Sequence, residues 1–463
     1  MACAYMEVKT VEDTSFSYGA VARYTAIALL LIGLVLLPGL VDTRYFRVLN
    51  TLMLLGILGL AGRTLVSVIL AFRRPDPPEL TLDDDELPSV SVVIPAYNEE
   101  PVLPDTIEAC KAVDYPAEKL EVVLCYEADS SDRTGEICRA AAAEDPRFKA
   151  VKRDEPGGGK AKAVNYALGH ATGDVIASID ADHCFKPDAV RRAVAWFDSD
   201  EDIWCIKGRC YGNNPTDSLI ALHATLERHI AEKGDLYARE VAGGFTIFGG
   251  GQAFFRAEVF DELGDFDEEV LVEDIDMSSK IHAAGKDLRV DPGIITFEEN
   301  PATLDAWWSQ RSRWARGWMQ VAMRYFVRLP RNASVSIGAK LDSLYTFAYA
   351  IVPAVIVLAF PLGLIRFHPD YVVSTYLPFE SYLWTSLMFI PAVVSVILFS
   401  QDRREGLSHH PREYLASITL WGYLILQTAV FVAAFIDEFV LGKPSVYVTT
   451  SRVESPADEP ADD

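Results

Sequence analysis

The stretch "VSVVIPAY", residues 90–97, is a short run of β-branched and apolar residues that ends beside a proline, which is typical of a buried strand. A helical pattern follows at residues 99–113. Further strands are predicted at 120–126 ("LEVVLCY"), 148–151 and 174–179 ("DVIASI"), alternating with helices at 132–143, at 160–168 and from Pro187. Alternation of this kind predicts an α/β fold with a mainly parallel sheet.

The globular region has clear borders in composition. The segment "RRPDPPELTLDDDELPS" before it is rich in proline and acids, and we read residues 73–88 as a linker. The domain that follows is predicted to cover residues 89–330, and its last part, 214–330, is expected to be mainly helical. Outside it we expect an N-terminal cytoplasmic segment (1–23), two transmembrane helices (24–72), about three more (331–441) and an acidic tail (442–463).

Apolar residues are segregated along the chain. Half of the 463 residues are hydrophobic, yet the formal net charge is −24. A span of the hydrocarbon core takes about 20 residues, and runs near that length lie at 24–41, 48–72, 344–365, 383–399 and 415–435. Arg63 is the main charge inside them, and we expect it to snorkel or to face a helix.

The basic residues that flank these runs predict an orientation. More Lys and Arg residues in the short flanks fall on the side of the N-terminus than on the opposite side, which places the N-terminus and the globular domain in the cytoplasm. We therefore expect a multi-pass protein of the cell membrane with the lipid bilayer as a partner. The side of the tail depends on whether all three late runs cross. The acidic charge argues against nucleic acid as a partner.

Polar side chains follow three of the predicted strands. They are Tyr97 and Glu99 in "AYNEE", Glu127 and Asp129 in "YEADSSD", and Asp180 and Asp182 in "DADH". One such group alone is typical of helix caps and turns. Three groups at the carboxyl ends of parallel strands, where such sheets bind ligands, predict a site.

Asp180 and Asp182 offer oxygen ligands to a hard cation, so the sequence predicts Mg²⁺ or Mn²⁺ at this pair, with a hydrogen-bonded turn as the alternative. In "GGGKAKAVNYAL", Lys160 begins a helix after a glycine turn, which favours an anion, although the spacing is not that of a P-loop. In "VEDIDM", Glu273 and Asp274 begin another helix. They either complement its dipole or supply a general base.

Taken together, the order of "IPAYNEE", "DADH", "GGGQAFFR", "VEDIDM" and "QRSRW" resembles the membrane-bound glycosyltransferases of family 2, the group of cellulose, hyaluronan and chitin synthases. The resemblance covers about residues 89–329. It implies a nucleotide-diphosphate-sugar-binding domain of the GT-A type, a divalent metal and inversion at the anomeric carbon.

The resemblance also assigns roles. Asp274 matches the family's general base, although Val272 replaces the threonine of its "TED" motif, and Asp182 is the leading metal ligand of the D-x-D pair. This chain has "EADSSD" where the family commonly has "DDGSTD", so either Glu127 or Asp129 contacts the nucleoside. The residues expected to bind substrate are Tyr97, Glu99, Glu127, Asp129, Lys160, Asp180, Gln252, Gln310, Arg313 and Trp314.

Gln310, Arg313 and Trp314 fall at i, i+3 and i+4, hence on one face of a helix. Arg316, Gln320, Arg324 and Arg328 recur every four residues beyond them. We expect the first half of this helix to close the site. The second half is expected to lie at the membrane surface with snorkelling arginines.

The expected function is inverting transfer of a sugar, favouring a UDP-sugar donor, to a growing polysaccharide at the cytoplasmic membrane face. One alternative is transfer of a single sugar to a lipid or lipid-linked acceptor. Another, from a different class, is a channel or transporter subunit with a nucleotide-sensing domain.

Overall fold

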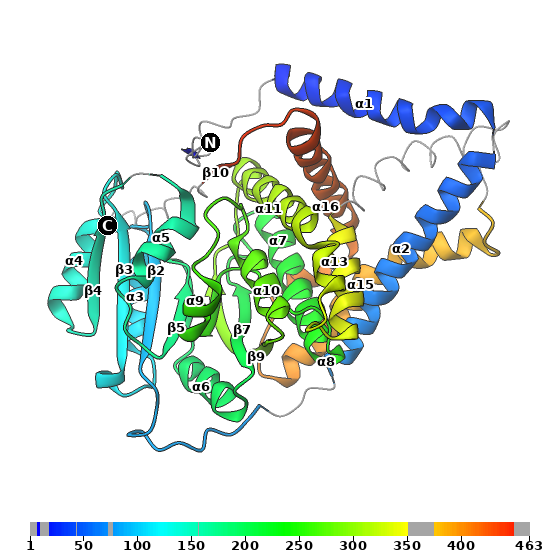
Figure 1. Ribbon diagram of the computed structural model, residues 1–463. Coiled ribbons are helices and arrows are strands. Elements are labelled where there is room, and N and C mark those ends of the chain that lie inside the picture. Colours follow the sequence, from blue (N-terminus) through cyan, green and yellow to red (C-terminus); the bar gives the residue numbers. More distant parts are fainter. Residues whose placement is uncertain are drawn as a thin grey trace, which may run out of the picture.

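One mixed sheet organises the globular part of the computed structural model, which describes residues 7–9, 18–42, 44–72, 77–155, 157–350 and 375–448. Its strand order is β4-β3-β2-β5-β8-β7-β9-β6. In Figure 1 the sheet and its flanking helices form one side of the molecule, and the apolar helices α2, α15 and α16 gather on the other.

The first half of the sheet is parallel, as predicted. Its strands are β2 (Val90–Ala96), β3 (Leu120–Glu127), β4 (Phe148–Arg153) and β5 (Val175–Ile179), and β2 pairs in parallel with both β3 and β5. The helices between them are α3 (Leu103–Lys111), α4 (Thr134–Glu144) and α5 (Gly159–Leu168), with the short η2 (Ala117–Lys119) before β3. The expected strands and helices are therefore present.

The second half contains strands that were not predicted. Residues 214–330 are mainly helical, as expected, but they also contain β8 (Gln252–Arg256) and β9 (Asp287–Glu298), which join β6 (Cys184–Phe185) and β7 (Ile203–Gly212). β8 pairs antiparallel with β5 and β7. These strands were overlooked because β9, "DLRVDPGIITFE", carries charges and an inner proline and glycine. The helices of this half are α6 (Ala189–Ser199), α7 (Leu219–His229), η3 (Ile230–Leu236), α8 (Tyr237–Ala242), α9 (Glu258–Leu263), α10 (Glu273–Ala283), α11 (Leu304–Tyr325) and α12 (Arg328–Arg331).

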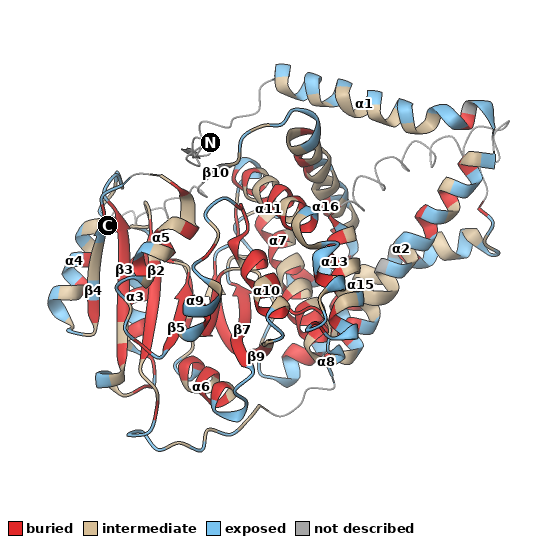
Figure 2. Ribbon diagram, viewed as in Figure 1, coloured by how far each residue is buried: buried red, intermediate tan, exposed pale blue. Residues whose placement is uncertain are grey.

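Helices cover both faces of the sheet, so its strands are buried on both sides (Figure 2). Within β2, Val92 and Ile94 pack with α3, α4 and α6, whereas Val93 packs with α5, α10 and α11. Neighbouring residues thus face two different cores. A strand between two helical layers is apolar throughout, which is why β2 reads as one continuous hydrophobic run.

Three helices are long and apolar enough to cross a membrane: Tyr18–Gly39, Arg44–Leu70 and Pro411–Val440. A bent pair, Glu380–Leu387 with Phe389–Arg404, would make a fourth. They correspond to α1 (Tyr18–Val41), α2 (Arg44–Leu70), α15 (Glu380–Arg404), and α16 (Pro411–Phe435) with η4 (Ile436–Val440). Tyr24 of α1 donates a hydrogen bond to Asp437 of η4, but the rest of α1 extends away from the sheet and none of its apolar window is buried (Figures 1 and 2), which favours membrane association.

Arg63 of α2 does not snorkel but faces two other helices, the second of the two expected alternatives. It pairs with Asp235, and its Nη2 lies 3.0 Å from Asp342 Oδ1 of α13 (Ile337–Tyr349). Its guanidinium also lies 4.5 Å from the centre of the Tyr345 ring. The charge therefore fastens α2 to the globular part.

Some sequence predictions fall outside the described residues. The run at 344–365 begins in α13, but residues 351–374 lie outside them, as do 449–463 of the acidic tail and 73–76 of the linker. Within the described part, a two-stranded parallel pair joins β1 (Glu7–Lys9) to β10 (Val446–Val448), so segments near the two ends of the chain meet.

Candidate active site

The polar groups that follow β2, β3 and β5 meet in one cavity of about 460 Å³ at the carboxyl edge of the parallel strands. Asn98 adopts a left-handed conformation (φ 56°), and its side-chain oxygen accepts a hydrogen bond from the Ser131 amide at 2.7 Å. This bond ties the loop after β2 to the loop after β3. Every residue of the predicted site except Gln252 lines the cavity: Tyr97, Glu99, Glu127, Asp129, Lys160, Asp180, Asp182, Glu273, Asp274, Gln310, Arg313 and Trp314.

The two carboxylates after β3 have different surroundings. Glu127 is buried and paired with Arg153, whose Nε lies 2.8 Å from Oε1 and whose Nη2 lies 2.8 Å from Oε2. Burial raises the pKa of Glu127, Arg153 opposes the rise, and Asp129 adds to it. Asp129 is exposed at the cavity wall. Glu127 is thus engaged within the protein, whereas Asp129 faces the opening.

The glycine turn before α5 brings Lys160 to the acids of the site. Gly157, Gly158 and Gly159 all have positive φ values (80°, 92° and 75°), which other residues rarely adopt. The turn places Lys160 in the first turn of α5, where its ammonium pairs with Asp180 and lies 3.8 Å from Glu273 Oε1. Lys160 therefore links the end of β5 to the start of α10.

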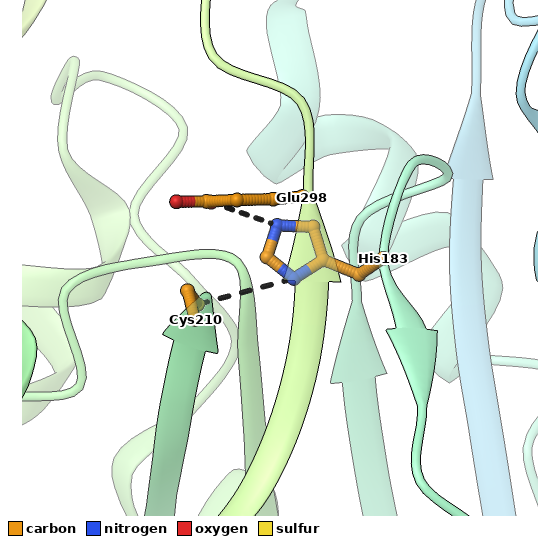
Figure 3. A group of neighbouring side chains, drawn as sticks. All are labelled: His183, Cys210 and Glu298. Atoms are coloured by element: carbon orange, nitrogen blue, oxygen red, sulfur yellow. Dashed lines mark hydrogen bonds and ion pairs between the residues drawn. The ribbon is translucent and has the colours of Figure 1, made fainter. Parts of the chain in front are cut away.

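The buried side chain of His183 anchors the turn after β5. No role was predicted for this residue. Its Nε2 lies 3.2 Å from Glu298 Oε2, and its Nδ1 lies 3.0 Å from Thr296 Oγ1 and 3.9 Å from Cys210 Sγ (Figure 3). The ligand atoms of Asp180, Asp182 and His183 lie within 4.8 Å of one another. The two aspartates therefore offer a compact oxygen-rich set that fits a hard cation.

Asp180 and Asp274 are held in opposite electrostatic states. Burial alone would raise the pKa of Asp180, but Lys160 and His183 bring it below its ordinary value. For Asp274, burial followed by the charge of Glu273 raises the pKa to about 6. Two carboxylates in one cavity with pKa values pushed apart are typical of a division between a permanently charged group and a proton acceptor.

The predicted face of α11 lies against the cavity. Gln310, Arg313 and Trp314 all line the cavity. The indole of Trp314 is held by two cations, because the Arg311 guanidinium lies 4.3 Å and that of Arg228 5.7 Å from its ring. Arg311 in turn pairs with Glu227 at 2.7 Å. The ring is therefore fixed in orientation at the cavity wall.

Two of the arginines that were expected to snorkel, Arg316 and Arg324, form ion pairs within the protein instead. Arg316 Nε lies 2.9 Å from Glu438 Oε2 of η4, and Arg324 Nη1 lies 2.6 Å from Asp267 and 2.7 Å from Asp276. Both arginines are committed to acids of neighbouring elements that are distant in sequence. Helical periodicity shows which residues share a face but not what that face meets.

Gln252 lies outside the cavity. Its side chain is fully buried in β8, and in the orientation that satisfies its hydrogen bonds its oxygen accepts from the amides of Gly208 (3.2 Å) and Arg209 (3.1 Å). These hydrogen bonds link β8 to β7 within the core. Conversely, Arg153, Arg228, His183 and Glu298 line the cavity without having been predicted. Arg153 ends β4, a fourth strand end at the same edge, and His183 directly follows Asp182.

Comparison with known proteins shows which family part of the chain resembles. Residues 91–264 match the model of the family "Glycosyl transferase family 2". The chain is 33% identical over 256 residues to a probable glycosyltransferase, YdaM, of Bacillus subtilis (53% of this chain, 60% of that protein). It is 28% identical over 260 residues to the beta-monoglucosyldiacylglycerol synthase of Synechocystis (54% and 52%). It is also 28% identical over 254 residues to the poly-beta-1,6-N-acetyl-D-glucosamine synthase of Staphylococcus aureus (55% and 59%). The chain thus spans between 52% and 60% of the length of these relatives.

Among solved structures, the chain resembles a mannosyltransferase, PcManGT, from Pyrobaculum calidifontis in complex with GDP-Man and Mn²⁺. The TM-score is 0.57 at 22% identity, and the match covers 85% of this chain and 99% of that one. This likeness concerns the fold. With the family match, it confirms the predicted GT-A fold with its mostly parallel sheet.

Proposed function

Because the chain carries a family 2 glycosyltransferase domain, we propose that it transfers a sugar with inversion from a nucleotide-diphosphate sugar, a UDP-sugar in our first choice, to a growing polysaccharide. One observation carries this proposal. A single cavity brings together the acids Asp180 and Asp182, the half-buried carboxylate of Asp274, and the α11 side chains Arg313 and Trp314. The nucleotide-sugar donor, the general base Asp274 and the sugar that receives the transfer can therefore meet at one anomeric carbon.

Asp180 and Asp182 are the residues that would hold Mg²⁺ or Mn²⁺ in this proposal. Lys160 already neutralises Asp180, which leaves Asp182 as the leading ligand. When bound, the cation supplies charge neutralisation at the diphosphate. Arg313, which reaches the same cavity from α11, presents a fork of donors that suits phosphate oxygens.

Asp274 acts as the general base. Its carboxylate accepts the proton of the acceptor hydroxyl while the hydroxyl oxygen bonds to the anomeric carbon. The bond between that carbon and the diphosphate oxygen breaks on the opposite face, and the electron pair leaves with the nucleoside diphosphate. One displacement of this kind inverts the configuration, by the same logic as an inverting glycosidase. Trp314, over whose ring Arg311 and Arg228 lie, would contact the acceptor sugar through the part of its indole that lines the cavity.

The pH dependence of turnover follows from this role. Asp274 works deprotonated, and its pKa of about 6 means that turnover falls by roughly tenfold per pH unit as the pH drops below that value. Glu273 raises that pKa through its negative charge, so Glu273→Gln is expected to move the acid limb to lower pH. Initial rates from pH 4.5 to 8 at saturating donor test this. An acid limb that does not move in Glu273→Gln contradicts the assignment.

In this proposal Asp129 contacts the nucleoside, because Glu127 is ion-paired with Arg153. Asp129→Asn is expected to weaken nucleoside diphosphate binding about tenfold or more, since a hydrogen bond to a charged group contributes roughly 1.5–3 kcal/mol. Glu127→Gln instead leaves Arg153 buried without its counter-charge, at a cost of about 3–5 kcal/mol in stability. Titration with a fluorescent nucleotide and thermal melting separate the two effects. The assignment fails if Glu127→Gln loses nucleotide affinity at full stability.

Transfer of a single sugar to a lipid acceptor is the second candidate. A specific observation keeps it: the glucolipid synthase and the polysaccharide synthase match this chain over similar lengths at the same identity of 28%. In both cases we propose a multi-pass membrane protein with two N-terminal spans, a linker at 73–88, a cytoplasmic domain at 89–330 and further spans at 331–441. The exposed leucines of α1 support membrane insertion.

The test is product analysis of the full chain, purified in detergent or nanodiscs, with a panel of UDP- and GDP-sugars. We expect nucleoside diphosphate release that depends on a divalent cation and yields a polymer that a matching glycosidase digests. A single-sugar lipid extracted into organic solvent supports the second candidate. Nucleotide binding without any release would overturn sugar transfer and favour a channel or transporter subunit with a nucleotide-sensing domain.

A further inference from the structure

A second group of side chains with metal-binding chemistry lies away from the cavity, where the glycosyltransferase domain meets the C-terminal apolar helices. His229 is the last residue of α7, His409 lies in the connection between α15 and α16, and Glu413 lies in the first turn of α16. Their ligand atoms lie within 4.8 Å of one another. None of the three lines the cavity.

The spacing of these atoms suits one small cation. Glu413 Oε2 lies 3.0 Å from His409 Nδ1 and 3.4 Å from His229 Nε2. Bonds from Zn²⁺ to nitrogen and oxygen of about 2.0–2.2 Å at tetrahedral angles place neighbouring ligand atoms roughly 3.3–3.5 Å apart. Only small side-chain adjustments are needed for all three to reach a shared ion.

The polar atoms of the buried His229 side chain are not satisfied by the protein contacts around them. Its side chain is fully buried, and neither of its ring nitrogens has a hydrogen-bond partner within the described part of the chain. The contact of Nε2 with Glu413 Oε2 at 3.4 Å is long for a hydrogen bond. The ring packs against Tyr211, with centroids 4.4 Å apart, and edge-on against His409 at 4.7 Å. A buried imidazole without a partner is costly, and coordination would satisfy one of its two ring nitrogens.

His409 already has the second contact that metal-binding histidines use. Its Nδ1 faces Glu413, and its Nε2 lies 2.7 Å from Asp402 Oδ2. Asp402 is fixed by Arg209, at 2.7 and 2.9 Å, and by Lys233 at 2.7 Å. A carboxylate that accepts the far N–H of a ligating histidine sets its tautomer and strengthens the ligand.

We propose that His229, His409 and Glu413 bind a Zn²⁺ ion that fastens the α15–α16 connection to the glycosyltransferase domain. Two imidazoles and one carboxylate form a set that prefers Zn²⁺ to Mg²⁺ or Mn²⁺. The pair Asp180 and Asp182 offers only oxygen ligands and therefore prefers Mg²⁺ or Mn²⁺ to Zn²⁺. The protein therefore has two sites for two classes of metal, one for chemistry and one for assembly.

The site would also position the acceptor side of the cavity. α16 holds α11, because Tyr423 accepts a hydrogen bond from Trp307 Nε1 at 2.8 Å, and Glu438 of the continuous η4 binds Arg316. α11 carries Arg313 and Trp314 into the cavity. An ion at the start of α16 thus fixes the helix against which α11 packs. Its role is structural, so it is separate from the transfer step itself.

Metal analysis of the full chain tests the proposal. The protein is purified through a tag that does not chelate metals, dialysed against Mg²⁺, and its zinc is measured by inductively coupled plasma mass spectrometry. We expect one Zn²⁺ per chain in the wild type. We expect the same in His223→Ala, a control on α7 whose histidine bonds to Leu219 and Thr419. Zinc is expected to fall to background in His229→Ala and in Glu413→Ala.

Two further measurements guard against variants that simply fail to fold. A zinc chelator is expected to lower the melting temperature of the wild type, and Zn²⁺ but not Mg²⁺ is expected to restore it. Wild type reloaded with Co²⁺ is expected to show the visible absorption of a Co²⁺ ion bound by protein ligands, absent in His409→Ala. Wild type that neither contains nor takes up zinc overturns the proposal. Zinc that persists in the His229 and Glu413 variants overturns it as well.

Discussion

Asp274→Asn is expected to lower the rate of sugar transfer by about 10²–10⁴-fold, the usual effect of removing a general base, while donor binding stays unchanged. Asparagine fills the same space in the half-buried position but cannot take the proton from the hydroxyl of the acceptor sugar. The charge of Glu273 and the pairing of Lys160 with Asp180 remain. The measurement is nucleoside diphosphate release at saturating donor, with donor affinity titrated separately.

The matched control is Asp261→Asn, the same change at an exposed position of α9 outside the cavity. It should retain wild-type turnover. Near-normal transfer by Asp274→Asn removes this residue from the role of base. A loss of donor affinity parallel to the loss of rate would place Asp274 in donor binding instead.

Asp182→Ala is expected to abolish the metal-dependent part of donor binding. Asp180 is neutralised by Lys160, so the loss of Asp182 leaves too few oxygen ligands for a hard cation. Nucleotide affinity measured with and without Mn²⁺ should differ clearly in the wild type and hardly at all in the variant. Electron paramagnetic resonance of Mn²⁺ reports the lost metal directly.

Asp188→Ala serves as the control, because this aspartate is exposed six residues farther along and makes no side-chain cap hydrogen bond to α6. It should bind donor and Mn²⁺ as the wild type does. Equal nucleotide affinity of the wild type with and without the cation contradicts the metal assignment at this pair. The zinc content described above should not change in Asp182→Ala, which keeps the two metal sites experimentally separate.

Much of the fold was predictable because it depends on local patterns. The runs that became β2, β3 and β5 are mostly apolar and bounded by turn residues, so both their type and their parallel pairing could be inferred. β9 was not predicted because its register with β7 includes irregularities and its sequence mixes charges with apolar residues. Its strand conformation comes from its partners rather than from its own periodicity.

The site was likewise predictable only in part. Acids at successive strand ends were expected to converge, because parallel strands end at one edge, and they do. The pairing of Glu127 with Arg153 could not be predicted, since it depends on where β4 ends beside β3. Nor could the placement of Gln252 in the core, because a glutamine beside three glycines resembles a loop residue until β8 is seen between β5 and β7.

The sequence by itself determined the parallel half of the sheet, the line of acids at its carboxyl edge, the face of α11 that enters the cavity and the apolar helices. These follow from periodicity and spacing, which act over a few neighbouring residues. Only the tertiary structure decided which charges are buried, which acids hold Arg63, Arg316 and Arg324, and that His229 meets His409 and Glu413. Burial and ion pairing depend on residues far apart in the chain, so they exist only once the chain is folded.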